Sequence, residues 1–267
     1  MSLQFNQTTI FFNGNPILVE SADIDVASDQ KPIYVFNKIN SIDSYSNAIK
    51  GNASFNYLME PGNEPNYNTI SGVLNNNLNY GGTSINIGSN VFTGYLSDYS
   101  FELSPGSIVK VKTNFQIYQE ITGLISNQTS SIASNGSGVA HYWSAQFISG
   151  SSPTAHNLLQ ASYSASLNLN PIYAIGNSNP TQVIVNSITE TLQTVSDLQV
   201  NPNFSGKIIN FLIPAIQNLK LNNISQNWGY PTSNITIPIT GMILDSLKYS
   251  VSQDNIILFN NIFKRFY

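Results

Sequence analysis

Acidic side chains in one proline-rich segment could carry acid–base chemistry. Glu60 and Glu64 flank the short run Pro-Gly-Asn, and two nearby carboxyls can serve as acid and base when their environments push their pKa values apart. The surrounding proline and glycine residues are typical of a turn, and no partnering motif follows. We therefore expect a solvated or intersubunit loop here.

Two further aspartates recur at similar places in the chain. Asp98 follows Thr93-Gly94 and Asp245 follows Thr240-Gly241, so the pair could be read as symmetric catalytic carboxylates. The structural interpretation is favoured, because an aspartate after a turn can accept backbone hydrogen bonds at the start of a hairpin.

The sequence gives little support for a metal site or for a catalytic nucleophile. Asp23, Asp25 and Asp29 lack the glycine turn and terminal glutamate of a helix–loop–helix calcium site, and Asp23 and Asp25 are expected to share a wet face of one strand. His141 and His156 have no serine-nucleophile motif beside them, and the chain contains no cysteine. The sequence predicts no catalytic residue, no metal and no cofactor, and hence a protein that is not an enzyme.

The composition favours assembly with other chains. Only 9% of the residues are charged, against about 25% in typical globular proteins, and neutral amides and hydroxyls take their place. Such a surface packs against another subunit with less desolvation cost. The formal net charge is −4, with ten acidic and five basic residues in the first 120, so no basic face for reading nucleic acid is expected. With no signal-peptide pattern or membrane-spanning apolar run, we expect a protein made in a cytoplasm.

The sequence contains an internal repeat, so the elements that must position these residues occur twice. Pro32-Ile-Tyr recurs as Pro171-Ile-Tyr, and the segment from Thr93 to Asp98 recurs from Thr240 to Asp245. The separation between Thr93 and Thr240 also aligns residues 109–115 with residues 256–262. We expect a first β-domain over residues 1–120, a Ser/Gly-rich linker over 121–154 and a second β-domain over 155–267.

Within each copy the polar and apolar residues alternate with a period of two, which predicts strands. The expected strands lie at 18–26, 85–87, 99–103, 109–111, 183–185 and 235–237, and Asn13-Gly14 is a hairpin turn. Helical spacing occurs at 67–74 and at 208–219, the second interrupted by Pro214. The fold class is mainly β, as two small sandwiches or open barrels with at most one short helix each.

Three segments carry a family resemblance: 167–176, ending in Pro-Ile-Tyr-Ala-Ile-Gly, then 184–198, then 240–249. This order resembles the bacteriophage tail tube domain, in which an early strand ending near Pro and Gly precedes a long excursion and a closing hairpin. Copy one lacks the glycine found at Gly176. The resemblance implies a β-sandwich whose hairpins line a lumen jointly with those of neighbouring subunits, loops that grip the next ring, and no catalytic residues.

On this resemblance the chain assembles with itself into stacked rings, three chains each, that conduct DNA without binding it specifically. Partners would be other virion tail proteins, with no membrane, and the location is the virion tail, assembled in the host cytoplasm. Asp23 and Asp25 would make the lumen acidic. The residues expected in the ring and lumen hairpins are Tyr99, Phe101, Val109, Val111, Leu247, Tyr249, Ile256 and Leu258.

Other arrangements and functions stay open at this point. Six chains per ring would place one copy at the lumen and the other outside. The chain could instead be a baseplate, neck or capsid-decorating protein. A carbohydrate-binding adhesin is a third function, for which Trp143 and Trp228 are too few and too isolated to specify a sugar site.

Overall fold

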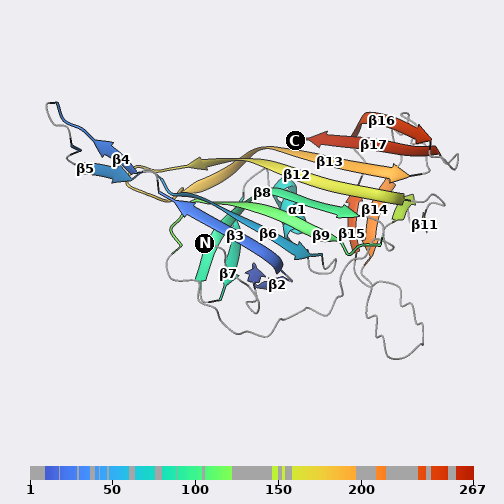
Figure 1. The fold of residues 1–267 in the computed structure, drawn as a ribbon, viewed down its shortest axis with the longest axis horizontal. Coiled ribbons are helices and arrows are strands. Elements are labelled where there is room, and N and C mark those ends of the chain that lie inside the picture. Colours follow the sequence, from blue (N-terminus) through green and yellow to red (C-terminus); the bar gives the residue numbers. More distant parts are fainter. Residues whose placement is uncertain are drawn as a thin grey trace.

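The computed structural model describes residues 10–17, 19–28, 30–36, 40–41, 43–46, 48–59, 64–75, 80–88, 90–103, 106–121, 146–149, 152–153, 158–196, 209–214, 234–238, 242–251 and 257–267. Most of them belong to antiparallel strands, and one long twisted sheet runs the length of the molecule (Figure 1).

Eight strands of the long sheet form two groups of four. The copy-one unit comprises β3 (Val19–Ala27), β6 (Lys50–Leu58), β9 (Lys110–Ile117) and β8 (Asn90–Leu103), in that spatial order. The copy-two unit comprises β12 (Leu158–Ile172), β13 (Gln182–Ser196), β17 (Ile257–Phe266) and β16 (Ile243–Val251), again in that order. Strand β8 pairs with β12, so the two units share one sheet.

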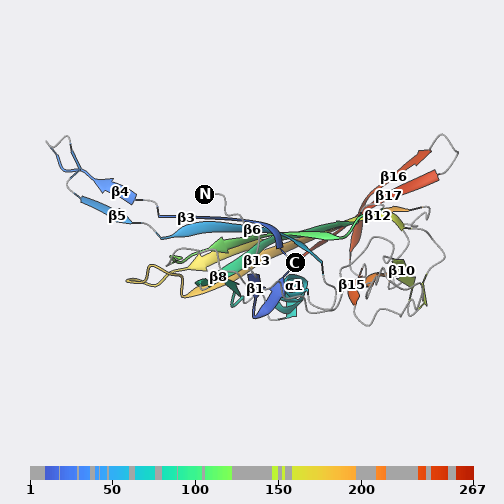
Figure 2. The ribbon, with the colours of Figure 1, turned by 60° about the horizontal axis from the view of Figure 1, so that its bottom comes forward.

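A second layer covers one face of the copy-one unit. It contains β1 (Ile10–Phe12), β2 (Asn15–Ile17), β7 (Thr83–Ile87) and helix α1 (Pro65–Asn75), and Figure 2 shows β1 and α1 together on the same side of the sheet. The β1–β2 turn is the predicted Asn13-Gly14, with φ of 50° and 80°, a conformation these two residue types adopt readily.

The core lies between these two layers. Phe12 of β1 packs edge to face on Phe55 of β6 at a centroid distance of 5.1 Å, and Phe115 of β9 completes the cluster. All three rings are fully buried. Tyr67 of α1 packs edge to face against Tyr163 of β12, so the helix also covers the place where the two units join.

Two smaller sheets complete the described chain. Strands β4 (Gln30–Ile33) and β5 (Asp43–Ser46) form an arm that projects beyond one end of the long sheet (Figure 1). A four-stranded sheet joins β11 (Ser152–Pro153), β10 (Gln146–Ser149), β14 (Ile209–Pro214) and β15 (Asn234–Pro238). Strands β10 and β11 fall within the range expected to be a linker.

The expected mainly β class is confirmed, and so is the helix at 67–74. The expected helix at 208–219 is wrong for its described part, because Ile209–Pro214 is strand β14 between β10 and β15. Isoleucine and phenylalanine favour an extended backbone, and Pro214 cannot continue a helix. The domain boundaries at 120 and 155 stay a prediction.

The two units repeat one another residue by residue in their pairing. The hairpin β3–β6 sets Val19 opposite Tyr57 and then has a bulge; β12–β13 sets Leu158 opposite Ser196, each partner shifted by 139 residues, and has the same bulge. The hairpin β8–β9 sets Leu96 opposite Phe115, followed by a bulge, and β16–β17 repeats it 148 residues later with Leu244 opposite Phe263.

This register corrects the sequence alignment of the closing hairpin by one residue. The alignment matched Asp98 with Asp245, whereas the pairing makes Asp98 equivalent to Ser246. A one-residue slip turns every side chain to the other face, and only the observed offset keeps Leu96 and Leu244 on one face. Pro32 and Pro171 do stand 139 residues apart, in agreement with the first hairpin.

Candidate assembly surfaces

The long sheet has one covered and one open face. Along β8, Tyr99, Phe101 and Leu103 are buried while the intervening residues point the other way. On that open face, side chains of neighbouring strands hydrogen-bond in rows: Ser54 Oγ donates to Asn114 at 2.8 Å and Gln116 Nε2 donates to Asn52 at 2.7 Å. The open face is thus a ladder of neutral amides and hydroxyls with interspersed charges.

The predicted residues of the first hairpin are found on the covered face. Tyr99, Phe101, Val109 and Val111 are buried in the core, so it is their neighbours in β8 and β9 that face outward from the sheet. In the second hairpin, Leu247 and Leu258 are half-buried and Tyr249 is 76% exposed, while Ile256 lies outside the described residues. Their place in a ring stays a prediction.

The aspartates singled out in the sequence are spread along the open face. Asp23 and Asp25 are exposed on β3, and their pairing partners on β6 are Ser54 and Asn52. Asp98 accepts hydrogen bonds from Ser97 Oγ at 2.9 Å and from Ser166 Oγ of β12 at 3.0 Å.

Asp98 and Asp245 stand at bulges inside long strands, which corrects the expectation that each follows a turn. Asp245 forms an ion pair of 2.9 Å with Lys264. A bulge redirects one side chain and strengthens the local twist, so both aspartates have a structural use.

The eight strands of the two units end in β3 and β16, each with a free edge. Among the strands that the structure describes, β3 pairs only with β6 and β16 pairs only with β17. Tyr249 and Val251 on β16 are 76% and 61% exposed. A long exposed edge with apolar side chains invites pairing with another chain unless it is protected.

The β4–β5 arm is a second exposed surface. Ile33, Tyr34, Val35 and Phe36 follow one another at its tip, all exposed, with Phe36 at 90%. The tip stands clear of the long sheet (Figures 1 and 2). Four consecutive exposed apolar residues make the tip a candidate interaction surface.

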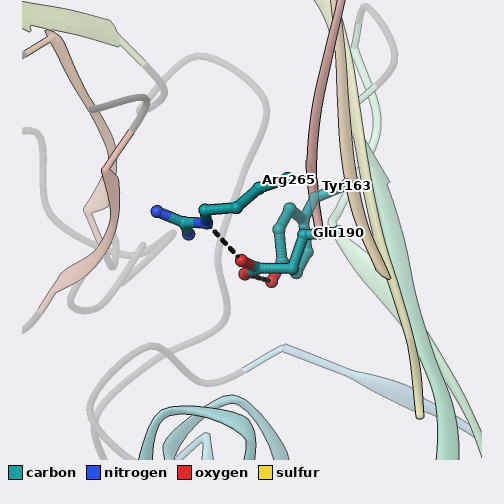
Figure 3. Close-up of polar contacts among 3 residues, drawn as sticks. All are labelled: Tyr163, Glu190 and Arg265. Atoms are coloured by element: carbon teal, nitrogen blue, oxygen red, sulfur yellow. Dashed lines mark hydrogen bonds and ion pairs between the residues drawn. The ribbon is translucent and has the colours of Figure 1, made fainter. Parts of the chain in front are cut away.

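Buried charge gathers beneath the copy-two unit (Figure 3). Glu190 on β13 is 2% exposed; it accepts a hydrogen bond from Tyr163 Oη, and its other oxygen accepts one from Arg265 Nε at 2.6 Å. Burial, and then the charge of Glu190, raise the pKa of Tyr163 well above its usual value. Arg265 also stacks over the Tyr267 ring at 5.3 Å.

A similar cluster lies under the copy-one unit and corrects the expectation for Glu64. This residue directly precedes α1, is 2% exposed and accepts a hydrogen bond of 2.5 Å from Tyr57 Oη, while Asn66 Nδ2 donates to the same hydroxyl at 2.8 Å. Glu64 is therefore part of the core and not of a solvated loop. Glu60 lies outside the described residues.

These clusters hold the fold together. Each carboxylate is buried and engaged by a tyrosine hydroxyl, and both hydroxyls keep their protons because burial raises the tyrosine pKa values. Within the described ranges, no three His, Asp or Glu residues gather as a metal site; His141, His156, Asp29, Trp143 and Trp228 fall outside those ranges. In the same part of the chain no helix is long and apolar enough to cross a membrane.

Sequence reasoning missed Glu190, Arg265 and the edge residue Lys248. Glu190 and Arg265 lie in strands whose apolar residues alternate with polar ones. A charged residue at such a position gives no sign of burial until its partner on the neighbouring strand is known. Lys248 gains its meaning only from the position of β16 at the end of the sheet.

Comparison with known proteins adds a remote structural likeness. No protein-family model matches the chain, and no curated protein does. A solved structure that aligns with it is the Dit protein (gp 19.1) of phage SPP1, described as a paradigm of the hub adsorption apparatus in phages infecting Gram-positive hosts. The alignment covers 97% of this chain and 99% of that one, at 12% identity and a TM-score of 0.23. A TM-score this low does not establish a shared fold or a shared function.

Proposed function

We propose that this chain is a structural virion protein that forms the rings of a bacteriophage tail tube. One observation carries the proposal: two four-stranded units with the same pairing register stand edge to edge in one sheet, and β3 and β16, at the two ends of these eight strands, have no outer partner among the described strands. A unit that joins its own duplicate in this way can join a further copy in the same way. Head-to-tail repetition closes into a ring when the rotation per unit allows it.

The polar open face suits the inner wall of such a ring. Amides and hydroxyls bonded to one another leave few groups free to hold a phosphate backbone. The acidic residues Asp23, Asp25, Asp98 and Glu102 share this face with Lys110, Lys112 and Lys248, so it carries charges of both signs and not a basic stripe. DNA would pass without specific binding. No catalytic step is assigned, since the buried carboxylates are engaged in the core.

Three chains per ring is the stoichiometry that the duplication favours. Six units would then stand around the lumen in pseudo-sixfold order, with the internal β8–β12 junction alternating with one between chains. The exposed arm tip would contact the neighbouring ring of the stack.

Electron microscopy of the purified chain, combined with mass per ring, tests the proposal. Rings or tubes with a mass of three chains are expected. Rings of six chains with one copy outside the lumen would overturn the stoichiometry. A chain that stays monomeric at every concentration, or that binds glycans as a monomer, would overturn the tail-tube assignment.

A further inference from the structure

The free edge of β3 is equivalent to an edge that is already paired inside the molecule. Strand β3 corresponds to β12 because both pair inward with the same register and the same bulge. In an antiparallel strand, successive residues direct their backbone N–H and C=O groups to opposite sides. Because β3 pairs with β6 in the same register as β12 pairs with β13, the backbone N–H and C=O groups that point to the outer edge belong to equivalent residues in β3 and β12. Strand β16 corresponds to β8 by the same reasoning.

From this equivalence we infer that β3 of one copy pairs with β16 of the next in the register of the internal β8–β12 junction. That junction sets Ser164 opposite Ser100 and Tyr163 opposite Phe101. Shifting the β12 residues back by 139 and the β8 residues forward by 148 gives the pairs between chains. Those pairs are Ala22 with Val251, Asp23 with Ser250, Ile24 with Tyr249, Asp25 with Lys248, Val26 with Leu247 and Ala27 with Ser246.

The side chains on the two edges complement one another in this register. On the open face Asp25 meets Lys248, and both side chains are exposed and close to no salt-bridge partner among the described residues. Opposite charges directly across a strand pair stabilise it. On the covered face, half-buried Ile24 meets Tyr249, which is 76% exposed in the single chain.

A shift of the two edges by one residue would lose this match. It would set Asp25 opposite Tyr249 or Leu247 and turn the apolar side chains of one strand toward the open face of the other. A shift by two residues keeps the faces but places Asp25 opposite Ser246 or Ser250. In one direction this shift sets Asp23 opposite Lys248, so the charges alone leave two registers. The equivalence with the internal β8–β12 junction selects the register with Asp25 opposite Lys248. This inference rests on the proposed function, because it names the partner edge within the ring.

Disulfide crosslinking tests the register directly, since the native chain has no cysteine. Directly opposed residues have Cα atoms about 4.5–5.5 Å apart, which a disulfide can bridge, whereas a separation above about 7 Å cannot be bridged without backbone movement. The Asp25→Cys/Lys248→Cys chain should give covalent multimers on a non-reducing gel after mild oxidation. The matched Asp25→Cys/Ser250→Cys chain, two residues out of register, should give at least about tenfold fewer.

A bond within one chain cannot mimic this result, because β3 and β16 stand at opposite ends of the eight strands of the two units. If loss of the charge pair prevents assembly, Val26→Cys/Leu247→Cys reports the same register from the covered face. Rings that form with crosslinks in the two-residue-shifted pair, or with none in either predicted pair, overturn the register and leave the proposed function standing. A chain that never assembles overturns both.

Charge reversal gives an independent readout. Asp25→Lys should raise the concentration needed for half-assembly by roughly tenfold, and Lys248→Asp likewise, while the double reversal should restore most of the loss. Glu120→Lys, at an exposed acid beyond the end of β9, is the control for net charge and should change little. Equal effects of Asp25→Lys and Glu120→Lys, or no rescue by the double reversal, would contradict the Asp25–Lys248 pair.

Discussion

The copy-one and copy-two units share their backbone pairing but differ in what lies beneath it. At one pair of equivalent positions, Gly51 faces Ile117 in the first unit, and Glu190 faces Arg265 in the second. At another, fully buried Phe55 corresponds to fully buried Thr194. The first unit has an aromatic core and the second a buried ion pair. Strand register therefore withstood changes that replaced the chemistry of the core.

The register is conserved between the units and the core is not, because different interactions determine the two. Register is set by backbone hydrogen bonds, by the bulges and by which face is buried, and all three are common to both units. The core needs only to fill its volume and satisfy its polar groups. The two units meet that need with different residues, so the two can be perturbed separately.

Alkaline pH is expected to have the largest effect, and more of the tyrosines whose pKa values are raised lie on the copy-one side. Burial raises the pKa of Tyr57 and Tyr99 well above the ordinary value and that of Tyr80 and Tyr118 to about 12. Between about pH 10 and these raised values the unfolded chain loses phenol protons that the folded chain retains, so stability falls as the pH rises.

Urea unfolding at about pH 8 and about pH 11, with phenolate absorbance recorded alongside, measures this loss. The midpoint should fall at the higher pH, and the phenolate of the buried tyrosines should appear together with unfolding. Phenolate absorbance from all fourteen tyrosines at about pH 10 in the folded chain would show that the buried tyrosines are accessible, against their burial in the core.

Removing the buried carboxylate should have the next largest effect. Glu190→Ala leaves the Arg265 guanidinium beneath the sheet without its ion-pair partner, which costs about 3 kcal/mol. Replacing both residues by leucine should cost less than the single change, because no charge is then left buried. Lys110→Ala, which breaks the exposed pair with Glu20, is the control and should cost less than about 1 kcal/mol. Similar losses for the buried and exposed pairs would remove the contrast between the two units.

The equivalent position in copy one is sensitive for a steric reason. A Cβ at Gly51 would stand 2.6 Å from the backbone oxygen of Asp25 and 2.7 Å from the Val26 side chain. Gly51→Ala should therefore destabilise the chain by about 2 kcal/mol and displace β3. Gly72→Ala, on α1 where an added Cβ meets nothing, should instead stabilise by about 0.5–1 kcal/mol. If Gly51→Ala stabilised the chain as Gly72→Ala is expected to do, β3 could move away from Gly51 without a loss of stability.

The strands were predictable from sequence where one face is buried, because alternation then shows in the residue types, as along β3 and β8. The repeat was detectable from Pro32 and Pro171, but its second offset was wrong by one residue. A bulge adds a residue without any sequence signal of its own, and Thr-Gly is too common a pair to fix a register. Glu64 was taken for a surface residue because its partner, Tyr57, becomes its neighbour only when α1 packs on β6.

The smallest expected difference compares the two tyrosine–glutamate pairs, which occur once under each unit. Tyr57→Phe removes a hydroxyl that donates to Glu64 and accepts from Asn66, whereas Tyr163→Phe removes one that donates to a glutamate also held by Arg265. A buried hydrogen bond contributes about 1 kcal/mol, and more when a partner is charged. Because Tyr57→Phe removes two hydrogen bonds of its hydroxyl and Tyr163→Phe removes the one to Glu190, Tyr163→Phe should cost about 1 kcal/mol and Tyr57→Phe about 2 kcal/mol. Urea unfolding of the two variants measures the difference, and Tyr249→Phe, at an exposed ring on β16, serves as the control that should change nothing in the single chain. A larger loss for Tyr163→Phe would mean that the ion pair depends on the tyrosine hydroxyl, and the copy-two cluster would then be the more tightly coupled of the two.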